Sequence, residues 1–261
     1  MKRRLIEPSE GVVLPSELSG LLRGGAIYDS SCSPEARVYY IDKASGYYLK
    51  RSALGSLSSE AEMTRYFHSK GLSVEVLAYL SSDGYDWLLT KKARGEDCTY
   101  RDYLAEPKRL AKLLGERLRE LHSLSAPDCP VQDRMQSYFS LAEENFLKRQ
   151  YDTSYYLGES SDPDEIWRIA ESGRGELSGR VLLHGDYCLP NVMLEDWKFS
   201  AFIDLGGGGI GDPHIDLYWG AWTLKFNLGT DDYRDIFLDA YGRDGVDEEK
   251  LLTVSAHEVF G

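Results

Sequence analysis

Over the first 90 residues, apolar and polar positions alternate in short runs, and turn-forming residues separate one run from the next. Residues 37–41 and 47–50 flank one turn, and residues 74–80 and 85–90 flank another that reads SSDG, so each pair predicts a β-hairpin. Between the hairpins, residues 58–69 repeat their apolar positions at helical spacing. The pattern predicts a small, mostly antiparallel sheet with one helix.

After about residue 95, the apolar positions follow a helical period. A stripe of leucines predicts a helix over residues 107–124, with Pro107 in its first turn. Further helices are expected over 133–151, from residue 162 onward, and over 216–226, 231–241 and 247–258. A short hairpin over residues 192–203 interrupts this helical region.

The change of period marks a domain boundary. Residues 91–95 read KKARG, which breaks the strand pattern before the first long helical stripe. We expect an N-terminal domain of residues 1–92 and a mostly helical C-terminal domain of residues 93–261, with the linker near 90–95. The predicted fold class is therefore α+β.

Two short apolar runs in the C-terminal half lead into acidic residues. Residues 184–191 read HGDYCLPN and carry Asp186 and Asn191, and residues 203–206 read IDLG and carry Asp204. An aspartate can orient a hydroxyl and take its proton, while an amide oxygen and a second carboxylate can hold a divalent cation on a nucleotide. These three residues are candidates for one phosphoryl-transfer site.

Lys50 and Glu60 form a second candidate pair, in the N-terminal domain. Lys50 ends an aromatic strand, and Glu60 lies in the first turn of the predicted helix, on its apolar face. A buried lysine–glutamate pair is costly unless it has a task, such as holding the lysine on nucleotide phosphates. The alternative is an exposed lysine, with an acidic residue that favours a helix N-terminus.

Charge narrows the class of partner. The 261 residues have a net charge of −13, and residues 151–261 hold 22 acidic against 8 basic side chains. A nucleic-acid backbone needs a basic surface, so the acidic half argues against that partner and suits a small cationic ligand. An acidic surface that only aids solubility is the alternative.

The sequence also bears on the cellular compartment. No run of about 18 apolar residues is present, and the N-terminal residues lack the apolar segment of a secretory signal, so neither a membrane span nor secretion is expected. The four cysteines are scattered without metal-ligand spacing. We interpret them as free thiols of a cytoplasmic protein.

The segments HGDYCLPN and IDLG resemble the aminoglycoside phosphotransferase family, which shares the protein-kinase-like fold. Residues 47–50 (YYLK), 118–122 (LRELH) and 211–217 (GDPHIDL) are similar to its 3′-phosphotransferases, the kanamycin and neomycin kinases. The similarity covers nearly the whole chain. It implies a bilobal fold and Mg²⁺-dependent phosphoryl transfer from ATP or GTP to an aminoglycoside, at the 3′-hydroxyl, which confers antibiotic resistance. It also implies a monomer.

The resemblance implies roles for the residues that match. Asp186 would accept the proton of the substrate hydroxyl or orient that hydroxyl, and Asn191 and Asp204 would bind Mg²⁺. Lys50 would contact the α- and β-phosphates and be held by Glu60. Glu62 is a rival partner for Lys50, but it lies about 200° around the helix from Glu60.

The remaining nucleotide contacts come from the turn and the linker. The resemblance implies phosphate contacts from Ser31, Cys32 and Ser33, adenine contacts from the backbone of Lys91 and Ala93, and stacking on the base by Tyr48. Most serine-rich turns between strands are only hairpin connections, and a strand tyrosine can equally pack in the core, so both alternatives stay open.

For the acceptor, carboxylates around a groove would match the several ammonium groups of an aminoglycoside. The candidates are Asp152, Glu159, Asp162 and Glu258. A kinase of choline, a fructosamine or a macrolide is the alternative, and Trp219 with Trp222 could form a choline cage, although their spacing also fits core packing. A nucleotide-binding module that no longer transfers phosphate is the third hypothesis.

Two positions depart from the pattern of the family. Its members often carry an arginine after the glycine of the IDxG motif, where this chain has Gly207, which suggests a flexible loop without that cation. They also often have two adjacent acidic residues near the C-terminus, where this chain has His257 before Glu258, and Gly261 is an extra residue. Both departures bear on the acceptor more than on the nucleotide.

Overall fold

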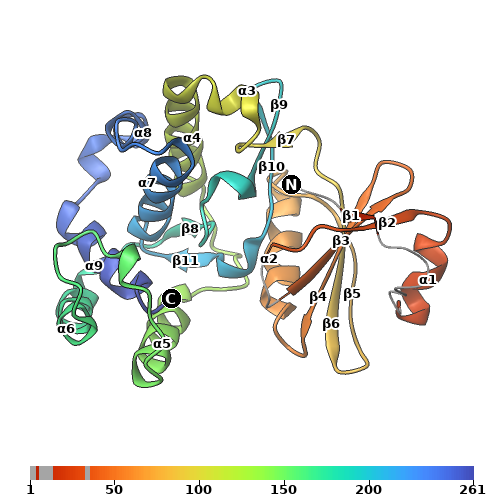
Figure 1. Cartoon of the computed structure of the whole chain (residues 1–261), viewed down its shortest axis with the longest axis horizontal. Coiled ribbons are helices and arrows are strands. Elements are labelled where there is room, and N and C mark those ends of the chain that lie inside the picture. Colours follow the sequence, from red (N-terminus) through yellow and green to blue (C-terminus); the bar gives the residue numbers. More distant parts are fainter. Residues whose placement is uncertain (1–3, 6–13, 33–35) are drawn as a thin grey trace. The chain divides into compact units, whose positions relative to one another are not determined.

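The computed structural model describes residues 4–5, 14–32 and 36–261. The chain divides into two compact units, which can be followed along the sequence colours of Figure 1. The first unit comprises residues 1–95 and the returning segment 200–206, and the second comprises residues 96–199 and 207–261. The chain therefore passes between the units three times.

The first unit is built on a six-stranded antiparallel sheet with the order β1-β2-β3-β4-β6-β5. Its strands are β1 (Arg4–Leu5), β2 (Ala26–Asp29), β3 (Ala36–Asp42), β4 (Tyr47–Ala53), β5 (Val76–Ser82) and β6 (Tyr85–Lys91). Both predicted hairpins, β3–β4 and β5–β6, are confirmed. Strand β5 begins two residues later than predicted, and β1 and β2 were not predicted.

Helices pack on both faces of this sheet. Leu18 and Leu22 of α1 (Ser16–Leu22), a helix that was not predicted, join Leu89 in one buried cluster. Ala61 of α2 (Ser58–Ser69) joins Leu88 in another. Adjacent strand residues point to opposite faces, so Leu88 and Leu89 assign the two helices to opposite sides. The predicted helix over residues 58–69 is confirmed.

The segment 200–206 is held in the first unit by Phe202. Its N–H donates to the Leu72 carbonyl at 2.8 Å, and its own carbonyl accepts from the Ser73 hydroxyl at 2.7 Å. Its ring meets that of Phe67 edge to face at 6.1 Å. Two residues later the same segment carries Asp204, which is thereby delivered to the sheet unit.

The second unit is mostly helical, as predicted. Its helices are α3 (Arg101–Leu104), α4 (Pro107–His122), α5 (Arg134–Leu147), α6 (Pro163–Gly173), α7 (His214–Leu228), α8 (Arg234–Tyr241) and α9 (Glu248–Glu258). The short α3 was not predicted. Helix α5 ends before the predicted residue 151, because Arg149 has a φ of +56°, outside the helical region. No helix of the described residues is long and apolar enough to cross a membrane.

Short strands in this unit frame the loops that matter for the site. Strand β8 (Val181–Leu183) pairs antiparallel with β11 (Gly209–Gly211). The predicted hairpin is β9 (Val192–Glu195) and β10 (Lys198–Phe202), and β9 also pairs with β7 (Glu96–Asp97). The HGDYCLPN segment therefore leaves the end of β8 and leads directly into β9.

Candidate active site

Lys50 lies between two carboxylates of the first unit. Its Nζ is 2.7 Å from Oε2 of Glu60 and 2.8 Å from Oδ1 of Asp204. Burial alone lowers the pKa of Lys50, but the charges of Asp204 and Glu60 outweigh burial and raise this pKa above its ordinary value. Glu62 is exposed. The structure thus joins Lys50 to Glu60 rather than leaving it as a surface lysine.

Glu60 and Asp204 share the single positive charge of Lys50. Burial and the charge of Asp204 raise the pKa of Glu60, while Lys50 opposes them. Asp204 has a left-handed backbone with a φ of +58°, a conformation that aspartate tolerates better than most residues, and its side chain is half exposed. One of the two carboxylates is therefore buried, and the other is open to solvent.

Ser31, which precedes β3, makes two hydrogen bonds to nearby residues of the same domain. The Ser31 N–H donates to Oδ1 of Asp29 at 2.9 Å, and the Ser31 hydroxyl accepts from the Val38 N–H at 2.9 Å. Cys32 is exposed, and Ser33 lies outside the described residues. Ser31 therefore closes this turn with both groups that were predicted to bind phosphate.

The predicted adenine contacts lie at the end of β6 and just beyond it. The Lys91 N–H donates to the Glu75 carbonyl at 3.0 Å, and its ammonium pairs with the Glu75 carboxylate at 2.5 Å. Ala93 is buried. Tyr48 is half-buried on β4, with its ring 5.4 Å from that of Tyr40. Tyr48 is therefore neither fully in the core nor fully exposed.

Asn191 fixes the carboxylate of Asp186 in the second unit. Its side-chain nitrogen donates to Oδ2 of Asp186 at 2.7 Å and to the Asp186 carbonyl at 3.0 Å. The Asp186 N–H donates to Nδ1 of His184 at 3.3 Å. Because both bonds of Asn191 use its nitrogen, the amide oxygen is directed away from Asp186. The structure thus brings Asp186 and Asn191 together, as the sequence suggested.

Asp216, at the start of α7, holds the Asp186 loop through hydrogen bonds to its backbone. Its fully buried carboxylate accepts the N–H groups of His184 and Gly185, each at 2.7 Å, and contacts Nε2 of His122 at 3.1 Å. The other ring nitrogen of His122 lies 2.9 Å from the Tyr241 hydroxyl. The sequence reasoning gave Asp216 no role, although an acid inside an apolar helix start is a signal that could have found it.

Gly185 and Gly207 pack backbone against backbone. A β-carbon on Gly185, whose φ is +84°, would lie 1.8 Å from the Gly207 carbonyl oxygen, and one on Gly207 would lie 2.7 Å from that of Gly185. Gly207 ends a 3₁₀ turn, Leu205–Gly207. Close backbone packing therefore accounts for the glycine at position 207, and the flexible loop expected there stays a prediction.

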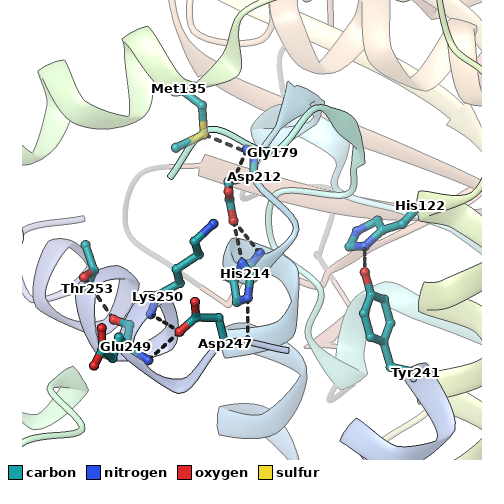
Figure 2. Close-up of polar contacts among 10 residues, drawn as sticks. All are labelled: His122, Met135, Gly179, Asp212, His214, Tyr241, Asp247, Glu249, Lys250 and Thr253. Carbon is teal, nitrogen blue, oxygen red and sulfur yellow. Dashed lines mark hydrogen bonds and ion pairs between the residues drawn. The ribbon is translucent and has the colours of Figure 1, made fainter. Parts of the chain in front are cut away.

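A polar chain connects the start of α7 to the start of α9 (Figure 2). Nδ1 of His214 donates to Asp212 at 2.7 Å, and the other Asp212 oxygen accepts the Gly179 N–H at 2.8 Å. Nε2 of His214 accepts the Asp247 N–H at 3.0 Å, and the Asp247 carboxylate caps α9. His214 is thus a strut that fixes the first turn of the helix ending in Glu258.

Glu258 is buried at the end of α9. The Tyr138 hydroxyl donates to its carboxylate at 3.0 Å. Burial raises the pKa of Glu258 to about 7, against hydrogen bonds from Tyr138 and Trp219, and the negative charge of Asp186 adds to the rise. This electrostatic effect links Glu258 to the Asp186 loop.

His257, the residue before Glu258, packs among aromatic side chains. It is fully buried, with its ring 5.0 Å from that of Phe139 and 5.7 Å from that of Tyr138. Its Nδ1 donates to the Thr253 carbonyl at 3.0 Å, and burial lowers its pKa to about 4. His257 therefore serves as a neutral packing residue, so the departure from an acidic pair at this position is a change of core and not of surface charge.

The other three predicted acceptor residues are exposed. Asp152 caps the 3₁₀ turn Thr153–Tyr155, and its N–H donates to the Val259 carbonyl at 2.9 Å, so it lies beside the C-terminus of α9. Asp162 caps α6 through the Asp164 N–H. No contact found among the described residues joins Glu159 or Asp162 to the Asp186 loop. Asp152 and Glu258 are thus the pair that the structure brings together.

The chain is similar to known proteins over most of its length. The phosphotransferase enzyme family (APH) matches residues 34–252 of the chain. A probable aminoglycoside 3′-phosphotransferase of Lactococcus lactis subsp. lactis is 47% identical over 248 residues, which cover 95% of each chain.

Solved structures share the fold. An aminoglycoside 3′-phosphotransferase of type VIII superposes with a TM-score of 0.78 at 25% identity, over 94% of this chain and 97% of that one. A 3″-phosphotransferase of Streptomyces rimosus, solved with ADP and streptomycin, has a TM-score of 0.71 at 22% identity. The match covers 86% of this chain and 91% of that one. The predicted kinase-like α+β fold is confirmed, and the chain belongs to the phosphotransferase enzyme family.

Proposed function

We propose that this protein transfers the γ-phosphoryl group of ATP or GTP to the 3′-hydroxyl of an aminoglycoside and thereby confers antibiotic resistance. The observation that carries the proposal is the Asp186 carboxylate, which Asn191 holds at 2.7 Å and whose negative charge adds to the raised pKa of the buried acid Glu258. The Lactococcus relative, at 47% identity, supports the choice of acceptor. We assign the nucleotide to the domain of residues 1–92 and the acceptor to that of residues 93–261, in a cytoplasmic monomer.

Lys50 is the proposed phosphate ligand. Its raised pKa keeps the ammonium charged, and Glu60 at 2.7 Å fixes its direction. Phosphoryl transfer needs positioning and charge neutralisation more than covalent chemistry, so one oriented lysine makes a large contribution. Ser31, Cys32 and Ser33, the backbone of Lys91 and Ala93, and Tyr48 are the further proposed nucleotide contacts.

Asp186 is the proposed catalytic residue. One hydrogen bond from Asn191 fixes a carboxylate oxygen of Asp186, and a second holds the Asp186 backbone carbonyl. An acceptor hydroxyl would therefore be oriented by, and give its proton to, a carboxylate that does not need to reorganise. The N–H groups of His184 and Gly185, anchored on Asp216, keep the loop in place. The same geometry would serve any alcohol, so it sets the reaction class and not the acceptor.

The donor set fits Mg²⁺. The Asn191 amide oxygen is directed away from Asp186, and Asp204 offers a half-exposed carboxylate, which are the hard oxygen ligands that Mg²⁺ prefers. Among the described residues, no group of three or more acidic, histidine or cysteine side chains is placed so that it could hold a metal ion. Bound there, Mg²⁺ would neutralise phosphate charge.

The acceptor site is proposed around Glu258 and Asp152, with Glu159 and Asp162 as outer carboxylates. Ammonium groups on an aminoglycoside would pair with these acids, while the hydroxyl reaches Asp186. A buried glutamate beside the reacting carboxylate suits a cationic acceptor better than a neutral one, because a cation stabilises both negative charges.

A phosphorylation screen tests the proposal. Purified protein, Mg²⁺ and ATP or GTP are incubated with kanamycin A, neomycin, streptomycin, choline and a macrolide, and the products are mapped by mass spectrometry and NMR. A phosphate at the 3′-position of kanamycin A is expected. Phosphorylation of choline or the macrolide alone would replace the proposed acceptor, and no product from any compound would reject the function.

Variants of the catalytic loop complete the test. Asp186→Ala should lower kcat by roughly 10²–10⁴-fold with the nucleotide KM nearly unchanged, since it removes the group that orients the hydroxyl. Glu62→Gln, an exposed change on α2, is the matched control and should leave kcat as it was. Turnover by Asp186→Ala at the rate of the unchanged protein would overturn the assigned role.

A further inference from the structure

Four aromatic side chains gather where α7 meets the 3₁₀ turn Thr153–Tyr155. The Tyr155 ring lies 5.7 Å from that of Trp219 and 5.5 Å from that of Trp222. Trp222 in turn stacks on Phe226 at 4.9 Å, with the two planes 11° apart. Tyr155, Trp219 and Trp222 are half-buried, and Phe226 is 70% exposed. This aromatic cluster therefore keeps ring surface in contact with solvent.

The cluster lies next to the reacting groups of the same unit. The Trp219 indole N–H faces the Glu258 carboxylate closely enough to lower its pKa by hydrogen bonding. One turn later on α7, the Thr223 hydroxyl accepts the N–H of Leu189, in the Asp186 loop, at 3.2 Å. Trp219 and Thr223 are four residues apart and so lie on the same face of α7, the face that contacts that loop.

Tyr155 provides a second, independent link. Burial raises the pKa of its hydroxyl, and the charges of Asp152, Cys188, Glu258 and Asp186 raise it further, in that order. Its position is fixed, because its carbonyl accepts the hydroxyl of Tyr218 from α7. Tyr155 therefore lies at the edge of the cluster where the charges of Asp152 and Glu258, two of the acids proposed for the acceptor, act on it.

We propose that Tyr155, Trp219 and Trp222 form an aromatic subsite for the acceptor, which stacks on the apolar face of an amino-sugar ring and attracts its ammonium groups. This inference rests on the proposed function and names a part of its site that carboxylates alone do not supply. Ammonium groups over an indole or phenol face gain cation–π attraction in addition to their ion pairs. The acids set the charge of the ligand, and the rings set the orientation of its sugar.

The test uses Trp222, because Trp219 also contacts Glu258. Trp222→Leu should raise the dissociation constant and the KM for kanamycin A by about tenfold. The nucleotide KM should not change, and kcat should change less than KM. Trp222→Phe, which keeps an aromatic face, should bind within about threefold of the unchanged protein. Titration calorimetry and steady-state kinetics measure these values on the full chain.

Matched controls separate a binding role from a packing role. Phe226→Leu removes the outer ring of the same stack and should alter kanamycin A binding by less than about twofold. Thermal unfolding of each variant reports any loss of folding. A Trp222→Leu protein that melts at a lower temperature but still binds kanamycin A normally would show packing only and overturn the subsite.

The outcomes also distinguish this inference from the function on which it rests. If the unchanged protein phosphorylates kanamycin A, Glu258→Gln weakens its binding and Trp222→Leu does not, the function stands and the aromatic subsite is rejected. If the unchanged protein neither binds nor phosphorylates any aminoglycoside, the function is rejected, and the ligand of the subsite with it. Weaker binding in both variants with unchanged nucleotide KM supports both.

Discussion

At the scale of single residues, Glu258 couples acceptor binding to pH. Its pKa of about 7, raised by burial, means that its carboxylate becomes charged only as the pH passes neutrality. An ammonium ligand prefers the charged form, so the acceptor KM should fall as pH rises from about 6 to about 8. Glu258→Gln should raise the KM and flatten this dependence. Kinetics with kanamycin A across this pH range test the prediction, with the nucleotide KM as control. The same pH dependence of the kanamycin A KM in both proteins would contradict it.

Glu258 and its neighbour His257 act on stability in opposite directions. Glu258 binds its proton more tightly when folded, so its contribution is present below its unfolded pKa, 4.5, and is lost as pH rises to about 7. His257 binds its proton less tightly when folded, so its contribution is lost as pH falls from 6.5 to about 4.

A variant separates the two effects. In Glu258→Gln the loss of stability with rising pH disappears, so the free energy of unfolding should increase more steeply between about pH 4.5 and 7 than in the unchanged protein. Urea unfolding at both ends of this window gives the comparison. In His257→Phe, which keeps a ring in the aromatic surroundings, the opposite change of slope is expected.

Gly207 offers a prediction about the backbone contact beside Asp186. Gly207→Ala places a β-carbon 2.7 Å from the Gly185 carbonyl, so the loop must shift, at a cost of roughly 1–3 kcal/mol in unfolding free energy and with a lower kcat. Gly206→Ala is the matched control, because its β-carbon would meet Glu60 only at 3.7 Å. Equal effects of the two changes in denaturation and turnover would refute the contact.

Residue spacing predicted the contacts around Lys50 and Asp186 better than those around Glu258. Lys50 with Glu60, and Asp186 with Asn191, lie in contact because fixed offsets along a strand, helix or loop fix their distances. Tyr138 and Trp219 meet Glu258 from distant helices. No local pattern encodes such packing, so the sequence offered only a set of nearby acids.

At the scale of elements, the His214 strut should control how α9 presents Glu258. His214→Ala removes the acceptor for the Asp247 N–H and one donor to Asp212, whose carboxylate keeps the N–H groups of His214 and Gly179. Unfolding free energy should fall by roughly 1–3 kcal/mol, and the acceptor KM should rise while the nucleotide KM stays constant.

An exposed change on the same helix provides the comparison. Glu249→Ala leaves the strut intact and should affect neither the acceptor KM nor stability beyond about 0.5 kcal/mol. If His214→Ala lowered stability but left the acceptor KM unchanged, the strut would be structural alone.

Elements with strong periodicity were predicted nearly to their ends, and weak ones were not. Helix α2 begins and ends as expected, because a full apolar face defines it. Helix α1 is short and has only two buried leucines, and two apolar positions are too few to show a helical period. The end of α5 depends on a left-handed Arg149, a conformation that its neighbours and not its own preference determine.

At the scale of the whole molecule, charge should govern the acceptor and not the nucleotide. The net charge of −13 arises in residues 151–261, where acids outnumber bases 22 to 8. Raising the ionic strength from about 0.05 to about 0.5 M screens this field and should raise the KM of a polycation severalfold. The KM of an anionic nucleotide should not follow the same trend. Parallel rises of both KM values would argue against the acidic field.

The passage of residues 200–206 back into the sheet unit has a consequence for synthesis on the ribosome. Residues 1–95 emerge first, yet their unit lacks Phe202, which bonds Leu72 and Ser73, and Asp204, which balances Lys50, until residues 96–204 have also been made. The N-terminal unit therefore cannot reach its final form when residue 95 has just been made. Its completion waits for residues 200–206, which are synthesised after residues 96–199 of the second unit.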